Sequence, residues 1–159
     1  MEKIIFKQAT TKNAGFILAE LIVVIFITGL LVAIAIPVFS TTIGYCILDN
    51  SARLLVLDIR SLQQSAINNE SAAFNIFFDN YYERYFLRNG LAAYKTVSLP
   101  DSVDLVFNNY QDSKLFCAAN GKPAGGIGGT VTLQDRQSKK LLYVIVDQIG
   151  RVRVSAIVP

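Results

Sequence analysis

One acidic residue lies inside the most apolar stretch of this chain. Between Phe16 and Phe39 the sequence contains a single charged residue, Glu20. A carboxylate in a hydrocarbon-facing helix costs about 2.5–3.5 kcal/mol on insertion scales, so its presence indicates a function and a partner. If the chain is cut between Gly15 and Phe16, a free α-amine appears four residues before Glu20, about one helical turn away. We therefore expect Glu20 to pair with such an amine, within one subunit or between neighbouring subunits.

Other groups that could do chemistry are few. The chain has no histidine, which excludes Ser-His-Asp and Cys-His catalytic arrangements, so an enzyme is the least supported class. Asp101, Asp104 and Asp112 could bind a metal, but their loose spacing favours a solvated turn, and we expect neither a metal nor a cofactor. Cys46 and Cys117 are too few for a disulfide framework. They could pair in an oxidising compartment, although we favour unpaired thiols.

Two surface features have a binding interpretation beside a structural one. In the glycine-rich segment 120–129, Pro123 follows Lys122 where a phosphate-binding loop has Ser or Thr, so a flexible inter-strand loop is favoured. Five basic residues near the C-terminus could form a patch for DNA, although arginine alternating with valine is also typical of a half-buried strand. These residues are Arg136, Lys139, Lys140, Arg151 and Arg153. The net charge after residue 15 is close to zero, which gives no strongly basic signature.

The stretch from Phe16 to Phe39 is long enough to cross a bilayer as a helix, since about 20 apolar residues suffice. A secretory signal has a shorter apolar core of roughly 7–15 residues. Such a signal, cleaved near Ala33-Ile34-Ala35, is the alternative, but it leaves Glu20 unexplained. Three lysines lie before the stretch, within residues 3–12, so the positive-inside rule places the N-terminus in the cytoplasm. We expect the chain after about residue 40 to be extracytoplasmic.

The remaining chain predicts a second half of the same helix, followed by strands. Apolar residues spaced by three and four predict an amphipathic helix that ends near Asn68-Asn69. They are Leu48, Ala52, Leu55, Ile59, Leu62 and Ala66. Short segments of apolar or aromatic residues, several of them alternating with polar ones, predict strands at about residues 72–78, 81–87, 91–97, 103–107, 114–118, 130–133, 141–147 and 151–157. Asn89-Gly90 is a strong hairpin signal. The sequence therefore predicts an α+β fold with antiparallel sheets packed on the outer half of a long helix.

The N-terminal pattern resembles the leader of type IV pilins and pseudopilins. A short basic leader precedes Gly15-Phe16-Ile17-Leu18-Ala19-Glu20, and Pro37 interrupts the apolar run. The resemblance implies that a prepilin peptidase cuts after Gly15 and methylates the new terminal Phe16. It also implies that Glu20 neutralises a neighbour's amine during filament assembly and that the helix bends or melts at Pro37. Ala19 departs from the family, where isoleucine or valine is common.

The C-terminal half resembles the H-type minor pseudopilins of type II secretion and the related minor pilins of type IV pili. The resembling segments are Leu99-Pro100 before an alternating strand, Gly129–Leu133, Tyr143–Asp147 and Gly150–Val154. The resemblance implies two antiparallel sheets packed as a sandwich beside the long helix. It implies a leader at residues 1–15, a transmembrane and assembly helix at residues 16–39, and a globular domain with the outer half of the helix at residues 40–159.

This resemblance implies a minor subunit of a pilus or pseudopilus, at or near the filament tip. Its partners would be other pilin or pseudopilin subunits, a prepilin peptidase, an inner-membrane assembly platform and membrane lipid. Before assembly the chain would be a single-pass protein of the cytoplasmic (inner) membrane. The alternative is a membrane-anchored extracytoplasmic binding module, such as a competence minor pilin, that contacts DNA or an exported protein.

Overall fold

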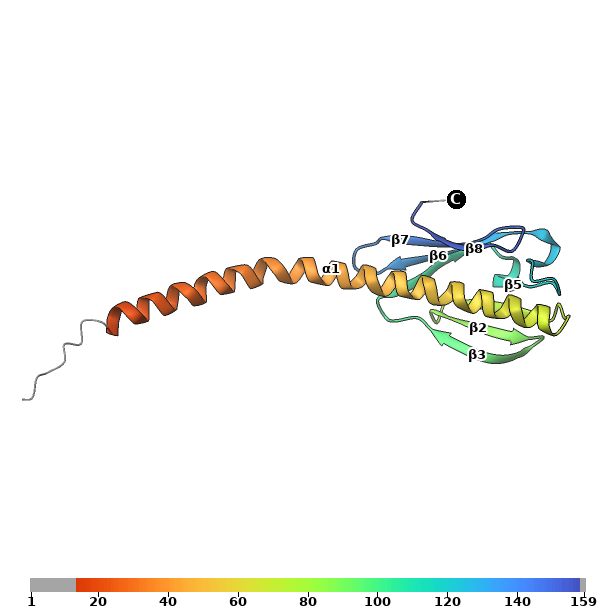
Figure 1. The fold of residues 1–159 in the computed structure, drawn as a ribbon, viewed down its shortest axis with the longest axis horizontal. Helices are drawn as coiled ribbons and strands as arrows, with labels where there is room; N and C mark the ends of the chain where they lie inside the picture. Colours follow the sequence, from red (N-terminus) through yellow and green to blue (C-terminus); the bar gives the residue numbers. More distant parts are fainter. Residues whose placement is uncertain (1–13, 158–159) are drawn as a thin grey trace, which may run out of the picture. The chain divides into compact units, whose positions relative to one another are not determined.

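The computed structural model describes residues 14–157, and it describes only the backbone of residues 14–17, 37 and 38. The chain divides into two compact units, residues 1–40 and 41–159. One helix, α1 (Ala14–Asn68), begins in the first unit and ends in the second; it runs from red to yellow in Figure 1. The predicted leader falls outside the described residues except for its last two, so its boundary stays a prediction.

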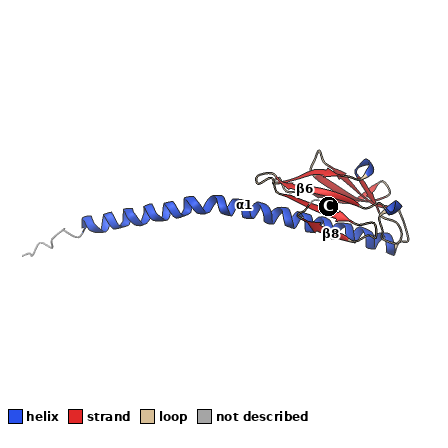
Figure 2. Cartoon of the chain, turned by 90° about the horizontal axis from the view of Figure 1, so that it is seen from above, coloured by secondary structure: helices blue, strands red, loops and turns tan. Residues whose placement is uncertain are grey.

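The second unit contains all the strands in the described part of the chain. They form two four-stranded antiparallel sheets with the orders β3-β2-β1-β5 and β4-β6-β7-β8. Figure 2 shows these strands in red beside the blue helix. The strands are β1 (Phe74–Asp79), β2 (Arg84–Asn89), β3 (Ala92–Ser98), β4 (Val103–Asn108), β5 (Lys114–Phe116), β6 (Gly129–Asp135), β7 (Leu141–Val146) and β8 (Val152–Ser155). Two short 3₁₀ turns are η2 (Gln111–Ser113) and η3 (Ala124–Gly126). The predicted α+β class with antiparallel sheets is confirmed.

The apolar stripe predicted for the outer half of α1 forms the helix side of the core. All six of its residues are fully buried: Leu48, Ala52, Leu55, Ile59, Leu62 and Ala66. They belong to one core with inward residues of both sheets, such as Ile76 of β1 and Val131 of β6. Full burial of each leucine or isoleucine contributes about 1.5–3 kcal/mol, so this stripe holds the outer half of α1 on the sheets.

One strand begins later than the sequence predicts. Tyr81, Tyr82 and Glu83 form a turn, and β2 starts at Arg84. The backbone N–H of Tyr82 donates to Asp79 Oδ1 (3.3 Å), and Glu83 has a φ of +49°, which strand residues do not adopt. The aromatic pair therefore lies exposed in the turn, despite the preference of tyrosine for strands. The other strands start and end within about two residues of their predicted positions.

The hairpin predicted at Asn89-Gly90 joins β2 to β3. Asn89 pairs with Ala92, so the loop consists of Gly90 and Leu91. Gly90 has a φ of +61°, which glycine adopts without a steric penalty and which two-residue hairpin loops require. The hairpin prediction is therefore confirmed.

Candidate functional site

The first unit presents an apolar helix without a protein cover. Between Leu18 and Ile36, every described large apolar side chain is exposed by 50–70%. These side chains lie on all faces of the helix rather than on one stripe, unlike those of a helix on the surface of a globular domain. Of the described residues, only α1 provides a helix long and apolar enough to cross a membrane. By length and composition, such a segment is able to cross a bilayer.

Glu20 lies exposed on this segment, in a shallow hollow with Ala19, Val23 and Val24. None of the ion pairs among the described side chains involves Glu20. Thr28 in the same segment differs, because its hydroxyl donates to the carbonyl oxygen of Val24 (2.6 Å). The helix therefore satisfies its own hydroxyl group, whereas the described residues offer no cation to its carboxylate.

The other predicted site residues of this unit are described by their backbone alone. Gly15, Phe16 and Pro37 lie within α1, which is continuous through all three positions. Cleavage after Gly15, methylation of Phe16 and a helix bend at Pro37 therefore stay predictions.

Carboxylates of the second unit hold the C-terminal arginines. Asp147 pairs with Arg151 (3.0 Å) and Arg153 (3.9 Å). Arg136 pairs with Asp104 and, at 3.9 Å, with Glu83. These pairs offset three of the five positive charges that the sequence suggested as a DNA-binding patch. The two charges without a carboxylate partner in the described ion pairs are those of Lys139 and Lys140.

The structure does not assemble the residues that could hold a metal or a disulfide. Among the described residues, no three His, Cys, Asp or Glu side chains gather into a metal site. Cys46 is an exposed free thiol and Cys117 a buried one. Burial raises the pKa of Cys117 to about 12, so at neutral pH this thiol is a protonated core group without nucleophilic reactivity.

A buried carboxylate that the sequence reasoning missed joins α1 to the first sheet. Asp58 of α1 is only 5% exposed. Its Oδ2 accepts a hydrogen bond from the Tyr85 hydroxyl (2.8 Å), and its Oδ1 accepts one from Lys95 Nζ (2.5 Å). Burial, together with the bond to Asp58, raises the pKa of Tyr85 well above its ordinary value. A sequence signal existed, because Asp58 follows Leu55 by three residues and precedes Ile59, which places it beside the buried stripe.

The turn between β6 and β7 meets α1 near the start of the second unit. Asp135 is buried against Gly44, where an added Cβ would lie 2.9 Å from its Oδ1. Ser138 donates its hydroxyl (2.5 Å) and its backbone N–H (2.7 Å) to Asp135 Oδ2, and these bonds lower the pKa of Asp135. Lys140 Nζ lies 5.1 Å from the centre of the Tyr45 ring. Gly44, which has no Cβ, thus allows Asp135 to approach α1 closely.

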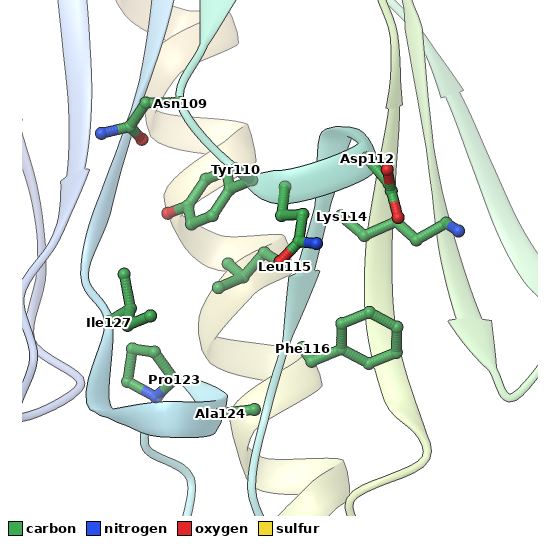
Figure 3. A pocket seen from close by; sticks show the side chains of 10 residues that line it. Asn109, Tyr110, Asp112, Lys114, Leu115, Phe116, Pro123, Ala124 and Ile127 are labelled. Atoms are coloured by element: carbon green, nitrogen blue, oxygen red, sulfur yellow. The ribbon is translucent and has the colours of Figure 1, made fainter.

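A pocket of about 330 Å³ is lined by residues of η2, β5 and the glycine-rich loop (Figure 3). Leu115, Pro123 and Ile127 supply its apolar lining. The hydroxyl of Tyr110 is buried and has no hydrogen-bond partner among the described residues, and burial raises the pKa of Tyr110. The lining also contains Asp112 and Lys114, but it contains no Ser, Cys or His, so a nucleophile paired with a histidine base is absent from it.

Comparison with known proteins finds its matches in solved structures. No known protein-family model and no curated protein matches the sequence. The type IV minor pilin FimU of Pseudomonas aeruginosa aligns with a TM-score of 0.56 at 13% identity, over 68% of this chain and 87% of that chain. A second crystal form of FimU gives 0.55 at 14% identity, over 68% and 92%. The minor pseudopilin EpsH of the Vibrio cholerae type 2 secretion system gives 0.52 at 13% identity, over 68% and 95%.

The chain has a pilin-like fold. At 13–14% identity the likeness concerns the arrangement of the backbone, namely a long N-terminal helix packed on two antiparallel sheets. This pilin-like fold is the one that the resemblance of the leader and of the C-terminal segments implied.

Proposed function

We propose that this chain is a minor pilin-like subunit that assembles into a type IV pilus or a type II secretion pseudopilus. The observation that carries the proposal is the exposed apolar helix of residues 18–36, whose one charge is Glu20, in a chain of pilin-like fold. Such a segment is stable in a bilayer, and after extraction it needs the apolar helices of neighbouring subunits around it. The role is therefore structural rather than enzymatic.

Proteolytic processing would supply the partner that Glu20 lacks. A prepilin peptidase cuts between Gly15 and Phe16 and methylates the new α-amine of Phe16. In a helix this amine lies four residues, about 6 Å along the axis, from Glu20. It is positively charged below its pKa of roughly 8. In surroundings of low dielectric the two opposite charges attract strongly, so the amine of one subunit would draw in Glu20 of its neighbour during assembly.

The charge distribution orients the subunit before assembly. Lys3, Lys7 and Lys12 keep the leader in the cytoplasm, and the second unit lies outside the cytoplasmic membrane. The inner-membrane assembly platform then extracts the subunit from the lipid. Pro37 removes one backbone hydrogen bond of the helix, which allows α1 to bend there. The resemblance to H-type minor pseudopilins supports a position at or near the filament tip.

The ion pairs of the arginines weigh against the DNA-binding alternative. Arg136, Arg151 and Arg153 already face carboxylates, and binding to phosphates depends on cations that are free to replace counterions. Salt-dependent retention of the detergent-solubilised protein on DNA would restore this alternative. We expect no retention even at low salt.

Variants of Glu20, produced in cells that carry the filament machinery, test the proposal. Glu20→Ala should enter the membrane, because it removes the insertion cost of the carboxylate, and it should be cleaved after Gly15. It should nevertheless be almost absent from sheared filaments, whereas Glu20→Asp should retain part of the incorporation. Thr28→Val is the matched control, because the Thr28 hydroxyl bonds only within its own helix. Normal incorporation of Glu20→Ala would contradict the proposed assembly mechanism.

A further inference from the structure

The outer face of the first sheet, β3-β2-β1-β5, presents aromatic and basic side chains. Successive residues of a strand point to opposite faces, and inward neighbours such as Ile76 and Leu87 belong to the core. The register of β2, β1 and β5 places the outward residues in two rows across the sheet. The first row is Arg88, Asn75 and Phe116, and the second is Phe86, Phe77 and Lys114.

Two arginines of β2 lie on the aromatic pair at the centre of this face. The rings of Phe77 and Phe86 stack with their centroids 6.1 Å apart. The guanidinium carbon of Arg88 lies 4.4 Å from the centre of the Phe77 ring and 5.1 Å from that of Phe86, and that of Arg84 lies 5.0 Å from the centre of the Phe86 ring. A guanidinium stacked on rings is already ordered, so it loses less conformational freedom when it binds a partner.

The positive charges of this face exceed its negative charges. Arg84 pairs with Asp79 (3.0 Å), but no ion pair between described residues involves Arg88 or Lys114. The Nε atom of Arg88 is buried and has no hydrogen-bond partner among the described residues. Because a partly buried charge without a counter-ion is unfavourable, the face is complementary to a partner that brings carboxylates.

The positions of the two unpaired cations define the spacing of those carboxylates. Arg88 and Lys114 are two strands apart and one row apart, which at about 4.8 Å per strand and 3.4 Å per residue separates their Cα atoms by about 12 Å. Figure 3 shows Lys114 on the same side of β5 as Phe116, whose ring is 42% exposed. An extended chain covers about 13 Å between residues i and i+4, and its residue i+2 points to the same side. That middle residue would lie over β1.

The same geometry disfavours a nucleic acid as the partner. Bases bind to such sheets by stacking on free aromatic faces, whereas guanidinium groups already lie over the rings of Phe77 and Phe86. Binding through the phosphates alone strengthens with the number of cations that replace counterions, and this face offers two unpaired ones among its described residues. The carboxylates of a polypeptide match two cations at this spacing.

We propose that the outer face of the first sheet binds an acidic, extended segment of another protein. Two carboxylates four residues apart pair with Arg88 and Lys114, and an apolar side chain midway between them lies over β1. All the residues involved belong to the second unit, so this inference does not depend on the membrane span or on the proposed function.

The probe is a fluorescently labelled peptide with the sequence Glu-Ser-Leu-Ser-Glu, and the control peptide is Gln-Ser-Leu-Ser-Gln. Both are titrated with the full-length protein in a zwitterionic detergent at low salt, and fluorescence anisotropy measures the affinity. We expect the acidic peptide to bind and the control peptide not to bind. Raising the salt concentration should weaken the binding, because the contacts are between charged groups at the surface.

Variants of the two cations separate a specific site from general charge attraction. Arg88→Gln should lower the affinity about ten-fold, since it removes charge-assisted hydrogen bonds. Arg88→Lys should also lower it several-fold, because an ammonium group keeps the charge but lacks the planar fork. Lys114→Gln should lower it about three-fold, as expected for a more exposed ion pair, and it disturbs no ring contact of Arg88. The matched control is Lys122→Gln, an exposed lysine of the glycine-rich loop, which should leave the affinity unchanged.

Equal binding of the two peptides, or an unchanged affinity in both Arg88→Gln and Lys114→Gln, would overturn the proposal. Two other results would overturn the partner assigned here. Oligothymidylate that binds as tightly as the acidic peptide, and that Arg88→Gln releases, would make the face a general anion site. A dimer of the protein that Arg88→Gln dissociates would make a second copy the occupant. None of these results affects the proposed function, which is tested through Glu20 of the first unit.

Discussion

Replacing Tyr85 by phenylalanine removes one hydroxyl group from the core and leaves the ring in place. Tyr85 is fully buried, and its hydroxyl donates to the carboxylate of Asp58, which is itself 5% exposed. A hydrogen bond to a charged group contributes about 1.5–3 kcal/mol, and the acceptor left behind has no water to replace it. Because Lys95 still contacts the other oxygen of Asp58, we take a loss of about 2 kcal/mol in the free energy of unfolding. At about 4 °C per kcal/mol this lowers the Tm by about 8 °C.

Near-UV circular dichroism of the full-length protein in mild detergent measures this effect. All seven tyrosines belong to residues 45–143, so the tyrosine band of the spectrum follows the second unit. Tyr81→Phe is the matched control, because the Tyr81 ring is 84% exposed, and its Tm should change little. Lys95→Met should cost less than Tyr85→Phe, since the lysine side chain is 44% exposed and partly screened by water. If Tyr85→Phe melted at the same temperature as the unchanged protein, the buried network would not stabilise the fold as argued.

Two further predictions concern the thiols and the β6–β7 turn. In the folded protein at pH 8, maleimide should label the exposed Cys46 and spare Cys117, because Cys117 is buried and burial raises its pKa. Mass spectrometry should show a second label only after unfolding. Ser138→Ala should raise the lowered pKa of Asp135 and reduce the free energy of unfolding by about 1 kcal/mol at pH 7. Because a lowered carboxyl pKa stabilises the fold above its unfolded value, this difference should shrink below about pH 4, and urea unfolding at pH 7 and pH 3.5 measures it.

Periodicity alone was enough to predict the outer half of α1 and its buried face. The stripe from Leu48 to Ala66 repeats every three or four residues, and burial of such a stripe needs no information from the rest of the chain. Asp58 was missed because a search for apolar positions ignores a carboxylate among them. Its partners Tyr85 and Lys95 lie 27 and 37 residues further along the chain, and local patterns do not reveal contacts at such separations.

The order of the strands in each sheet could not be predicted from the sequence, because local patterns do not reveal contacts between residues far apart in the chain. β1 pairs with β5 as well as with its neighbour β2, and β4 pairs with β6, which depends on long-range closure rather than on local residue types. At Tyr81 and Tyr82 the local rule gave the wrong result, because the Asp79 turn prevails over the strand preference of aromatic residues. In the first unit, residue types indicated Glu20 as the unusual charge, but its proposed partner belongs to a processed N-terminus or to another subunit.

The mass of the N-terminal peptide of the membrane-bound protein, isolated from its own cells, tests the central claim most directly. The account predicts a chain that begins at Phe16 and carries one added methyl group on its α-amine. Glu20 then has a cation four residues away, and filament assembly through this helix follows. A chain that still begins at Met1, or that starts beyond Ala35, would contradict the account, because neither form supplies the amine that Glu20 requires.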